Sequence, residues 1–165
     1  MSGFSKKAPK ASKSASQSEP LFELPTVIRM LPLVRRIAED ILSVQGDLRK
    51  LRFEVQALDE LRRDLPWPVR QRRYQLHETI SAAERRGRGY VHELEGLGVA
   101  VMDSKTAQLG FPTIVNGKLA FFSWLPSEET VTFWHYDREE VRRRPVPEAW
   151  YKPIPQRTSA PRRKG

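Results

Sequence analysis

The hydrophobic positions between residues 27 and 58 repeat with the spacing of a heptad. Apolar side chains recur there at alternating steps of three and four residues, and charged side chains fall between them. This period places one apolar stripe along an α-helix, which is the pattern of a helix that packs against another helix. The positions that we assign to the partner-helix seam are Val34, Ile37, Ile41, Val44, Leu48, Leu51, Val55 and Leu58.

A second helical pattern follows after a short break. Pro66 and Pro68 end the first helix near Asp64, because proline disfavours the helical conformation in the residue before it. Apolar or small residues then recur at heptad spacing from Val69 to Leu97. Two matched seams joined by a short turn predict an antiparallel, coiled-coil-like helical hairpin over about residues 24–97.

The two predicted helices are unequal. Arg73, Ala83 and Gly87 occupy positions of the second seam where the first helix has large apolar side chains. Small residues there let the helices approach closely or leave room for a third helix. The first helix is also longer than the second, so we expect apolar seam residues at its far end to remain for a binding partner. Pro32 predicts a kink in the first turns of this helix, unless the helix itself begins near Pro32.

Beyond Gly98 the hydrophobic period changes from seven residues to two, which is typical of strands. Asn116-Gly117 between two apolar runs predicts a hairpin with a type I′ turn, and Pro112 is expected to end the second strand. We predict a small, mostly antiparallel, aromatic-rich sheet over about residues 98–136. Its apolar runs are Val99–Met102, Leu109–Phe111, Ile114–Val115, Leu119–Trp124 and Val131–His135.

These elements predict an α+β fold with one domain at residues 21–144. The net charge of +9 is concentrated outside this domain. Residues 1–20 have a net charge of +3 and residues 142–165 have a net charge of +7, whereas residues 21–141 hold 17 basic and 18 acidic side chains. We interpret residues 1–20, rich in Lys, Ser and Ala, as a disordered tail and residues 145–165, rich in Pro and Arg, as an extended tail.

The composition excludes several functional classes. The chain has no cysteine, which removes disulfides, thiolate nucleophiles and Cys-ligated zinc. Residues 1–20 have no apolar run of the length that a secretory signal needs. The sequence contains no apolar stretch long enough for a membrane span, no phosphate loop and no metal-ligand spacing among its histidines. We therefore expect a cytoplasmic protein without membrane contact, cofactor or metal.

A few residues near the end of the predicted sheet are candidates for a ligand site or a structural cluster. They are Trp124, Glu128, Trp134, His135 and Arg144. An imidazole oriented by a carboxylate is a minimal acid/base pair, so His135 with a nearby acidic residue is one candidate site. We favour the alternative in which His135 is hydrogen-bonded at the end of a strand.

Several of these residues also belong to a set that resembles a known family, domain-of-unknown-function family 2203. The resemblance covers about residues 21–146, and its most specific part is the spacing from Trp124 through Glu128 to Trp134-His135, followed by Arg144-Pro145. It implies two long helices with a small β-element and no established activity. Other matching positions are Leu21-Phe22, Leu31-Pro32-Leu33-Val34, Leu97-Gly98-Val99, Met102-Asp103, Gly110-Phe111-Pro112, Gly117 and Phe133.

The chain departs from the family pattern at polar positions. Ser123-Trp124-Leu125 stands where members usually have Cys-Trp-Arg, and Tyr136 stands where an acidic residue usually follows the Trp-His pair. The family resemblance therefore implies that two polar members of any shared site are absent here. This weakens an enzymatic hypothesis.

Three functional hypotheses remain. We favour a non-enzymatic module that uses the helical hairpin to bind itself or another protein. The first alternative is a nucleic-acid or ribosome-associated protein that binds RNA or DNA through the basic tails. The second is an enzyme or small-ligand site around Trp124, Glu128, His135 and Arg144, which has no accompanying nucleophile, metal set or cofactor loop.

Overall fold

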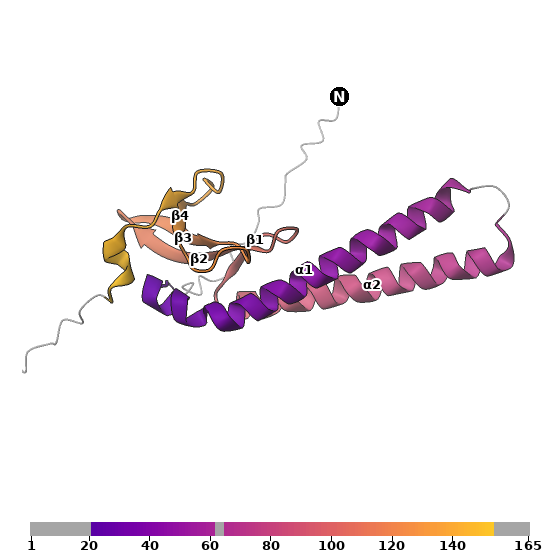
Figure 1. Ribbon diagram of the computed structural model, residues 1–165, viewed down its shortest axis with the longest axis horizontal. Coiled ribbons are helices and arrows are strands. Elements are labelled where there is room, and N and C mark those ends of the chain that lie inside the picture. The colour runs from indigo at the N-terminus through magenta and orange to yellow at the C-terminus, as the bar shows by residue number, and fades with distance from the viewer. Residues whose placement is uncertain (1–20, 62–64, 154–165) are drawn as a thin grey trace, which may run out of the picture.

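The computed structural model describes residues 21–61 and 65–153. In this part of the chain two antiparallel helices are followed by one five-stranded sheet (Figure 1), which confirms the predicted α+β class. The segments 1–20 and 154–165, where we predicted basic tails, lie outside the described residues. The elements are α1 (Leu24–Glu60), α2 (Trp67–Gly96), β1 (Ala100–Asp103), β2 (Gln108–Val115), β3 (Lys118–Trp124), β4 (Phe133–Tyr136), β5 (Arg144–Pro145) and the 3-10 helix η1 (Glu148–Tyr151).

The sheet lies at one end of the hairpin, over the N-terminal part of α1, and the other end of the hairpin projects away from it (Figure 1). Its strands follow each other in sequence order, and every neighbouring pair is antiparallel. None of the helices in the described part of the chain carries an apolar stretch long enough to cross a membrane.

The main core forms between the sheet and the N-terminal half of α1. One face of the sheet supplies aromatic side chains to this core, including Phe111, Phe122 and Trp124. Side chains alternate between faces along a strand, so Phe121 and Ser123 point to the opposite face. A second, smaller cluster is formed farther along the hairpin by Val44, Leu48 and Ala83.

The extra length of α1 lies at its N-terminal end. α1 has 37 residues and α2 has 30. Leu24, Val27 and Leu31, in the additional turns, are buried in the core shared with the sheet. We expected uncovered seam residues at the opposite end instead, but Val55 is buried and Leu58 is half-buried there, because α2 still accompanies α1. α1 bends near its start (Figure 1), as expected from the proline in its first turns.

Pro112 lies inside β2, so the prediction that it ends the second strand is wrong. β1 pairs with β2 only as far as Gly110, and the outward side of Pro112 therefore faces no strand. Its missing N–H costs no ladder hydrogen bond, and its carbonyl accepts a hydrogen bond from the Phe22 N–H at 2.8 Å. The predicted type I′ turn is confirmed, because Asn116 and Gly117 have φ values of 52° and 73°.

The folded part of the chain continues past residue 144, where we expected an extended tail. The ring of Trp150 in η1 lies 6.1 Å from that of Phe122 and 5.4 Å from that of Trp134, measured between centroids. Composition alone predicted an extended tail, but these aromatic contacts bury part of η1 against the sheet.

Candidate functional site

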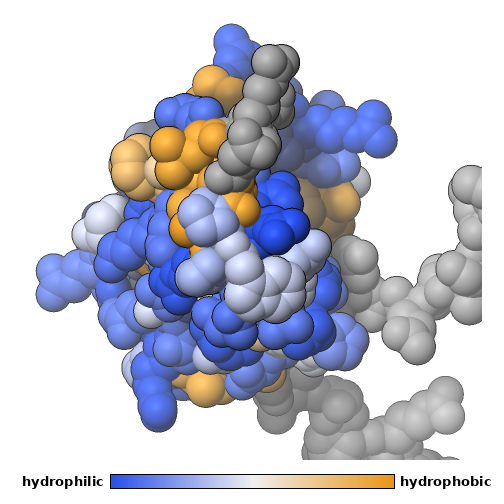
Figure 2. Space-filling view, turned by 90° about the vertical axis from the view of Figure 1, so that its right-hand side faces the viewer, coloured by the Kyte–Doolittle hydropathy of each residue, from blue (hydrophilic) through white to orange (hydrophobic). Residues whose placement is uncertain are grey.

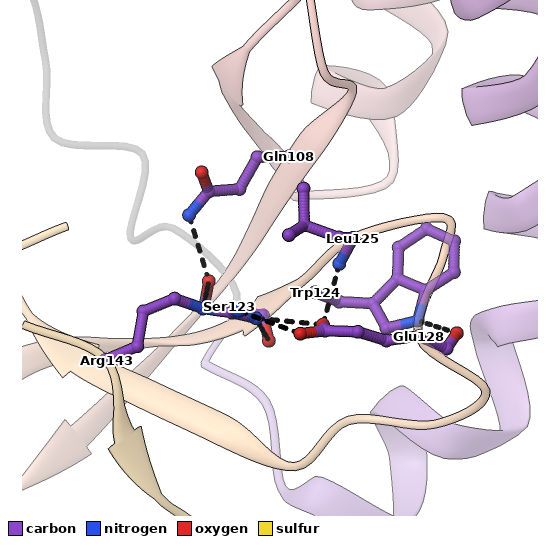
Figure 3. Close-up of polar contacts among 6 residues, drawn as sticks. All are labelled: Gln108, Ser123, Trp124, Leu125, Glu128 and Arg143. Carbon is purple, nitrogen blue, oxygen red and sulfur yellow. Dashed lines mark hydrogen bonds and ion pairs between the residues drawn. The ribbon is translucent and has the colours of Figure 1, made fainter. Parts of the chain in front are cut away.

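The densest polar cluster in the described residues lies where β3 ends. Figure 3 shows Gln108, Ser123, Leu125, Glu128 and Arg143 linked by hydrogen bonds and an ion pair beside the Trp124 ring. The cluster joins β2, β3, the turn after β3 and the segment that leads into β5. We call these five residues, together with Trp124, the Glu128 cluster.

Glu128 closes the turn that follows β3. Its backbone N–H donates to the Leu125 carbonyl at 2.9 Å, and its carboxylate accepts a hydrogen bond from the Leu125 N–H at 2.9 Å. Its own carbonyl accepts a hydrogen bond at 3.1 Å from the indole N–H of Trp124, whose side chain is fully buried. The turn is therefore held by a side chain, a backbone amide and a core aromatic residue at once.

Arg143 makes a two-point ion pair with Glu128. The Nη1–Oε1 distance is 2.7 Å and the Nη2–Oε2 distance is 2.8 Å. The two side chains are only 21% and 18% exposed, so this pair is shielded from water far more than the other ion pairs of the hairpin and sheet. Bidentate arginine–carboxylate pairs are strong and fix the orientation of both groups.

Ser123 lies beneath this pair and is fully buried. Its hydroxyl oxygen accepts hydrogen bonds from Gln108 Nε2 at 3.1 Å and from Arg143 Nε at 3.0 Å. A serine nucleophile needs a base that accepts its proton and needs access for a substrate. Ser123 has two donors on its oxygen and no exposed surface, so its geometry serves packing rather than nucleophilic chemistry.

Arg35 of α1 ties this turn to the helices. Its guanidinium donates to the carbonyls of Pro126 at 2.8 Å, Glu128 at 3.0 Å and Glu129 at 3.1 Å. The same group lies over the Trp124 ring, 4.9 Å from its centroid. Sequence reasoning did not single out Arg35, because no motif marks an arginine whose partners are carbonyls more than 90 residues away.

The structure divides the five sequence-predicted residues among separate places. Trp124 and Glu128 lie together in the Glu128 cluster. Trp134 and Arg144 lie on the helix-facing side of the sheet, with the Arg144 guanidinium 5.4 Å from the Trp134 ring centroid and 3.3 Å from Glu139.

His135 lies on the opposite side of the sheet from Trp134. Its ring stacks against Phe121, with 5.7 Å between centroids, and is fully buried. Its Nδ1 donates to the Tyr136 carbonyl at 2.8 Å, and its Nε2 has no hydrogen-bond partner among the described residues. No carboxylate is hydrogen-bonded to either ring nitrogen in this part of the chain.

Across residues 21–61 and 65–153, no group of three histidine, aspartate or glutamate side chains is arranged to hold a metal ion.

A groove lies between the two helices. It has a volume of about 740 Å³, and residues of the turn between β1 and β2 form part of its lining. Gly87 leaves the groove open, because a larger residue at position 87 would place its side chain in the space beside Val44. Its apolar lining consists of Ile41, Val44, Leu48 and Val91, and its polar rim consists of Gln45, Arg52, Glu84, Arg88, His92, Glu95, Ser104 and Lys105.

These features define an α+β protein in which a two-helix hairpin carries a five-stranded antiparallel sheet, with a partly buried polar cluster at the end of β3. The model of domain-of-unknown-function family 2203, described as an uncharacterised conserved protein, matches residues 20–146. The chain therefore belongs to this family, as the resemblance predicted. Searches among curated proteins and solved structures found no match.

Proposed function

We propose that this protein is a non-enzymatic interaction module that associates with a second copy of itself through the groove between α1 and α2. The observation that carries the proposal is the groove itself. Gly87 takes the place of a large seam side chain, so the helices leave a lined hollow where a tightly matched hairpin would leave none.

The rim of the groove supports a second copy as the occupant. It carries both signs of charge, with Arg52, Arg88 and Lys105 against Glu84 and Glu95. In a two-fold symmetric dimer each surface meets its own copy, so a rim of mixed charge can set basic groups against acidic ones. Two helical hairpins joined in this way form a four-helix arrangement around shared apolar positions.

Two glycine substitutions in α2 test this proposal. A Cβ at Gly87 would lie 3.4 Å from Val44 Cγ1, which is an ordinary contact, and the rest of a Gly87→Met side chain would occupy the groove. A Cβ at Gly89 meets nothing within 4 Å, so Gly89→Met is the matched control. Both variants remove a helical glycine and should gain up to about 1 kcal/mol of helix stability.

Light scattering and sedimentation over a concentration series give the readout. We expect the wild type and Gly89→Met to self-associate and Gly87→Met to remain monomeric. A wild-type protein that stays monomeric at every concentration would refute self-association. Equal association of both variants would show that the groove is not the interface.

A further inference from the structure

The free end of the hairpin carries planar side chains along one exposed face of α2. Trp67, Arg70, Tyr74 and His77 are spaced by three, four and three residues, which aligns them on one face of a helix. All four are exposed, with Trp67 at 63% and Tyr74 at 65%. We call these residues the planar stripe.

The stripe lies beside a hollow at the tip of the hairpin. This hollow has a volume of about 330 Å³ and is lined by Leu58, Asp59, Leu65, Arg70, Arg73 and Tyr74. Figure 2 looks onto this end of the molecule and shows apolar and weakly polar side chains gathered among hydrophilic ones. Contiguous exposed apolar surface, unlike single scattered side chains, marks interaction sites.

The charge of the free end is positive. Residues 49–77 contain eight basic and four acidic side chains, a net charge of +4, whereas residues 24–48 contain three of each. Arg72 and Arg73 pair with Glu54 and Asp59. Among the described residues, Arg70 makes no ion pair, and its guanidinium lies 5.6 Å from the Trp67 ring centroid. An exposed guanidinium beside an exposed indole offers adjacent places for an anionic group and for a planar group to bind.

We propose that the planar stripe binds single-stranded nucleic acid. Trp67 and Tyr74 are seven residues apart, about 10 Å along the helix axis, so each can stack on a different base. Arg70 lies between them on the same face, where its guanidinium meets a phosphate or an adjacent base. An acidic protein segment would satisfy the charge but would make no use of the aligned rings. The site is distinct from the groove and from the predicted tails.

Fluorescence anisotropy with labelled oligo(U), oligo(dT) and a DNA duplex tests the proposal on the full-length chain at about 0.15 M salt. We expect oligo(U) or oligo(dT) to bind more tightly than the duplex. Trp67→Ala should weaken single-strand binding by about fivefold or more, and Trp67→Ala with Tyr74→Ala by about twentyfold or more. Trp67→Phe, which keeps a stacking ring, should retain most of the affinity.

Charge controls separate stacking from general attraction. Arg86 is an exposed arginine of α2 outside the stripe. Arg70→Gln should weaken binding more than Arg86→Gln, although both remove one positive charge. Neutralising the basic residues of segments 1–20 and 154–165 should lower the salt dependence of binding and leave the Trp67 effect in place.

Three results would overturn the proposal. The first is no binding by the wild type to either single strand. The second is unchanged single-strand affinity in the Trp67→Ala/Tyr74→Ala double variant, which would assign binding to the tails. The third is equal binding of a labelled polyglutamate peptide with the same loss in the double variant, which would assign the stripe to an acidic protein. Circular dichroism of the exposed-site variants should match the wild type.

Discussion

At the scale of single residues, Glu128 and Arg143 join segments that are distant in sequence. Their ion pair has two contacts of 2.7 and 2.8 Å and low exposure, so solvent screens it weakly. In a double-mutant cycle with Glu128→Gln and Arg143→Met, we expect a coupling free energy of about 1–3 kcal/mol. Urea unfolding of the four proteins measures this quantity.

The Glu139–Arg144 pair is the matched control for that cycle. It has a single contact of 3.3 Å, and its side chains are 43% and 41% exposed. Exposed pairs contribute at most about 1 kcal/mol, so the cycle with Glu139→Gln and Arg144→Met should give a smaller coupling energy. Equal values for the two pairs would contradict a special role for the Glu128 cluster.

Sequence reasoning placed Arg144, rather than Arg143, near Glu128. The pairing of β4 with β5 sets Arg144 opposite Trp134, so its side chain lies on the face of Trp134 and Tyr136. Arg143 precedes it by one residue and therefore turns to the other face, over the Phe133 ring. A shift of one residue reverses the face of every side chain in a strand, and sequence spacing alone does not define that register.

At the scale of elements, Arg35 connects α1 to the turn after β3. Its guanidinium donates to three carbonyls and stacks on a buried indole. We expect Arg35→Ala to lower the free energy of unfolding by about 2–4 kcal/mol, because charge-assisted hydrogen bonds and a cation–π contact are lost together. Arg35→Lys should recover little of this, because an ammonium group lacks the planar fork that reaches three acceptors.

The neighbouring arginine supplies the control. Arg36 is exposed on the same helix, and no hydrogen bond or ion pair of its side chain occurs in the described residues. Thermal unfolding should show that Arg36→Ala changes stability by less than about 0.5 kcal/mol. If both alanine variants had the same small effect, the link between α1 and the turn would contribute nothing measurable.

The elements differ in how well sequence predicted them. The heptad spacing from Val34 to Leu58 was sufficient to predict the first helix, and Asn116-Gly117 was sufficient to predict the turn between β2 and β3. Both features depend on local periodicity or backbone preference. Pro112 was misjudged because its tolerance depends on where β1 stops pairing, which is a long-range property. The role of η1 was missed for the same reason, since Trp150 is stabilised only by contacts with strands earlier in the chain.

At the scale of the whole molecule, packing is unevenly distributed along the hairpin. Beside the sheet, α1 buries Leu24, Val27, Leu31, Val34 and Ile37 in a core with several strands. Toward the tip the helices pack only on each other. Beyond the Val44–Leu48–Ala83 cluster, Val55 and Leu76 are the buried residues in the described part of the hairpin. Three ion pairs also join α1 to α2 there, and all of their side chains are at least 39% exposed. Exposed pairs of this kind do not replace a core.

This gradient predicts that the hairpin opens from its tip. Amides of residues 49–60 and 67–80 should exchange with solvent at least about tenfold faster than those of residues 27–44 and 118–124, because few buried contacts oppose local opening. Hydrogen exchange followed by mass spectrometry measures both sets in one experiment. Uniform protection along α1 would mean that the hairpin unfolds as one unit. Slower exchange of the tip on addition of oligo(U) or oligo(dT), without change in the sheet, would place binding on the planar stripe. Slower exchange confined to the groove at higher protein concentration would instead mark self-association.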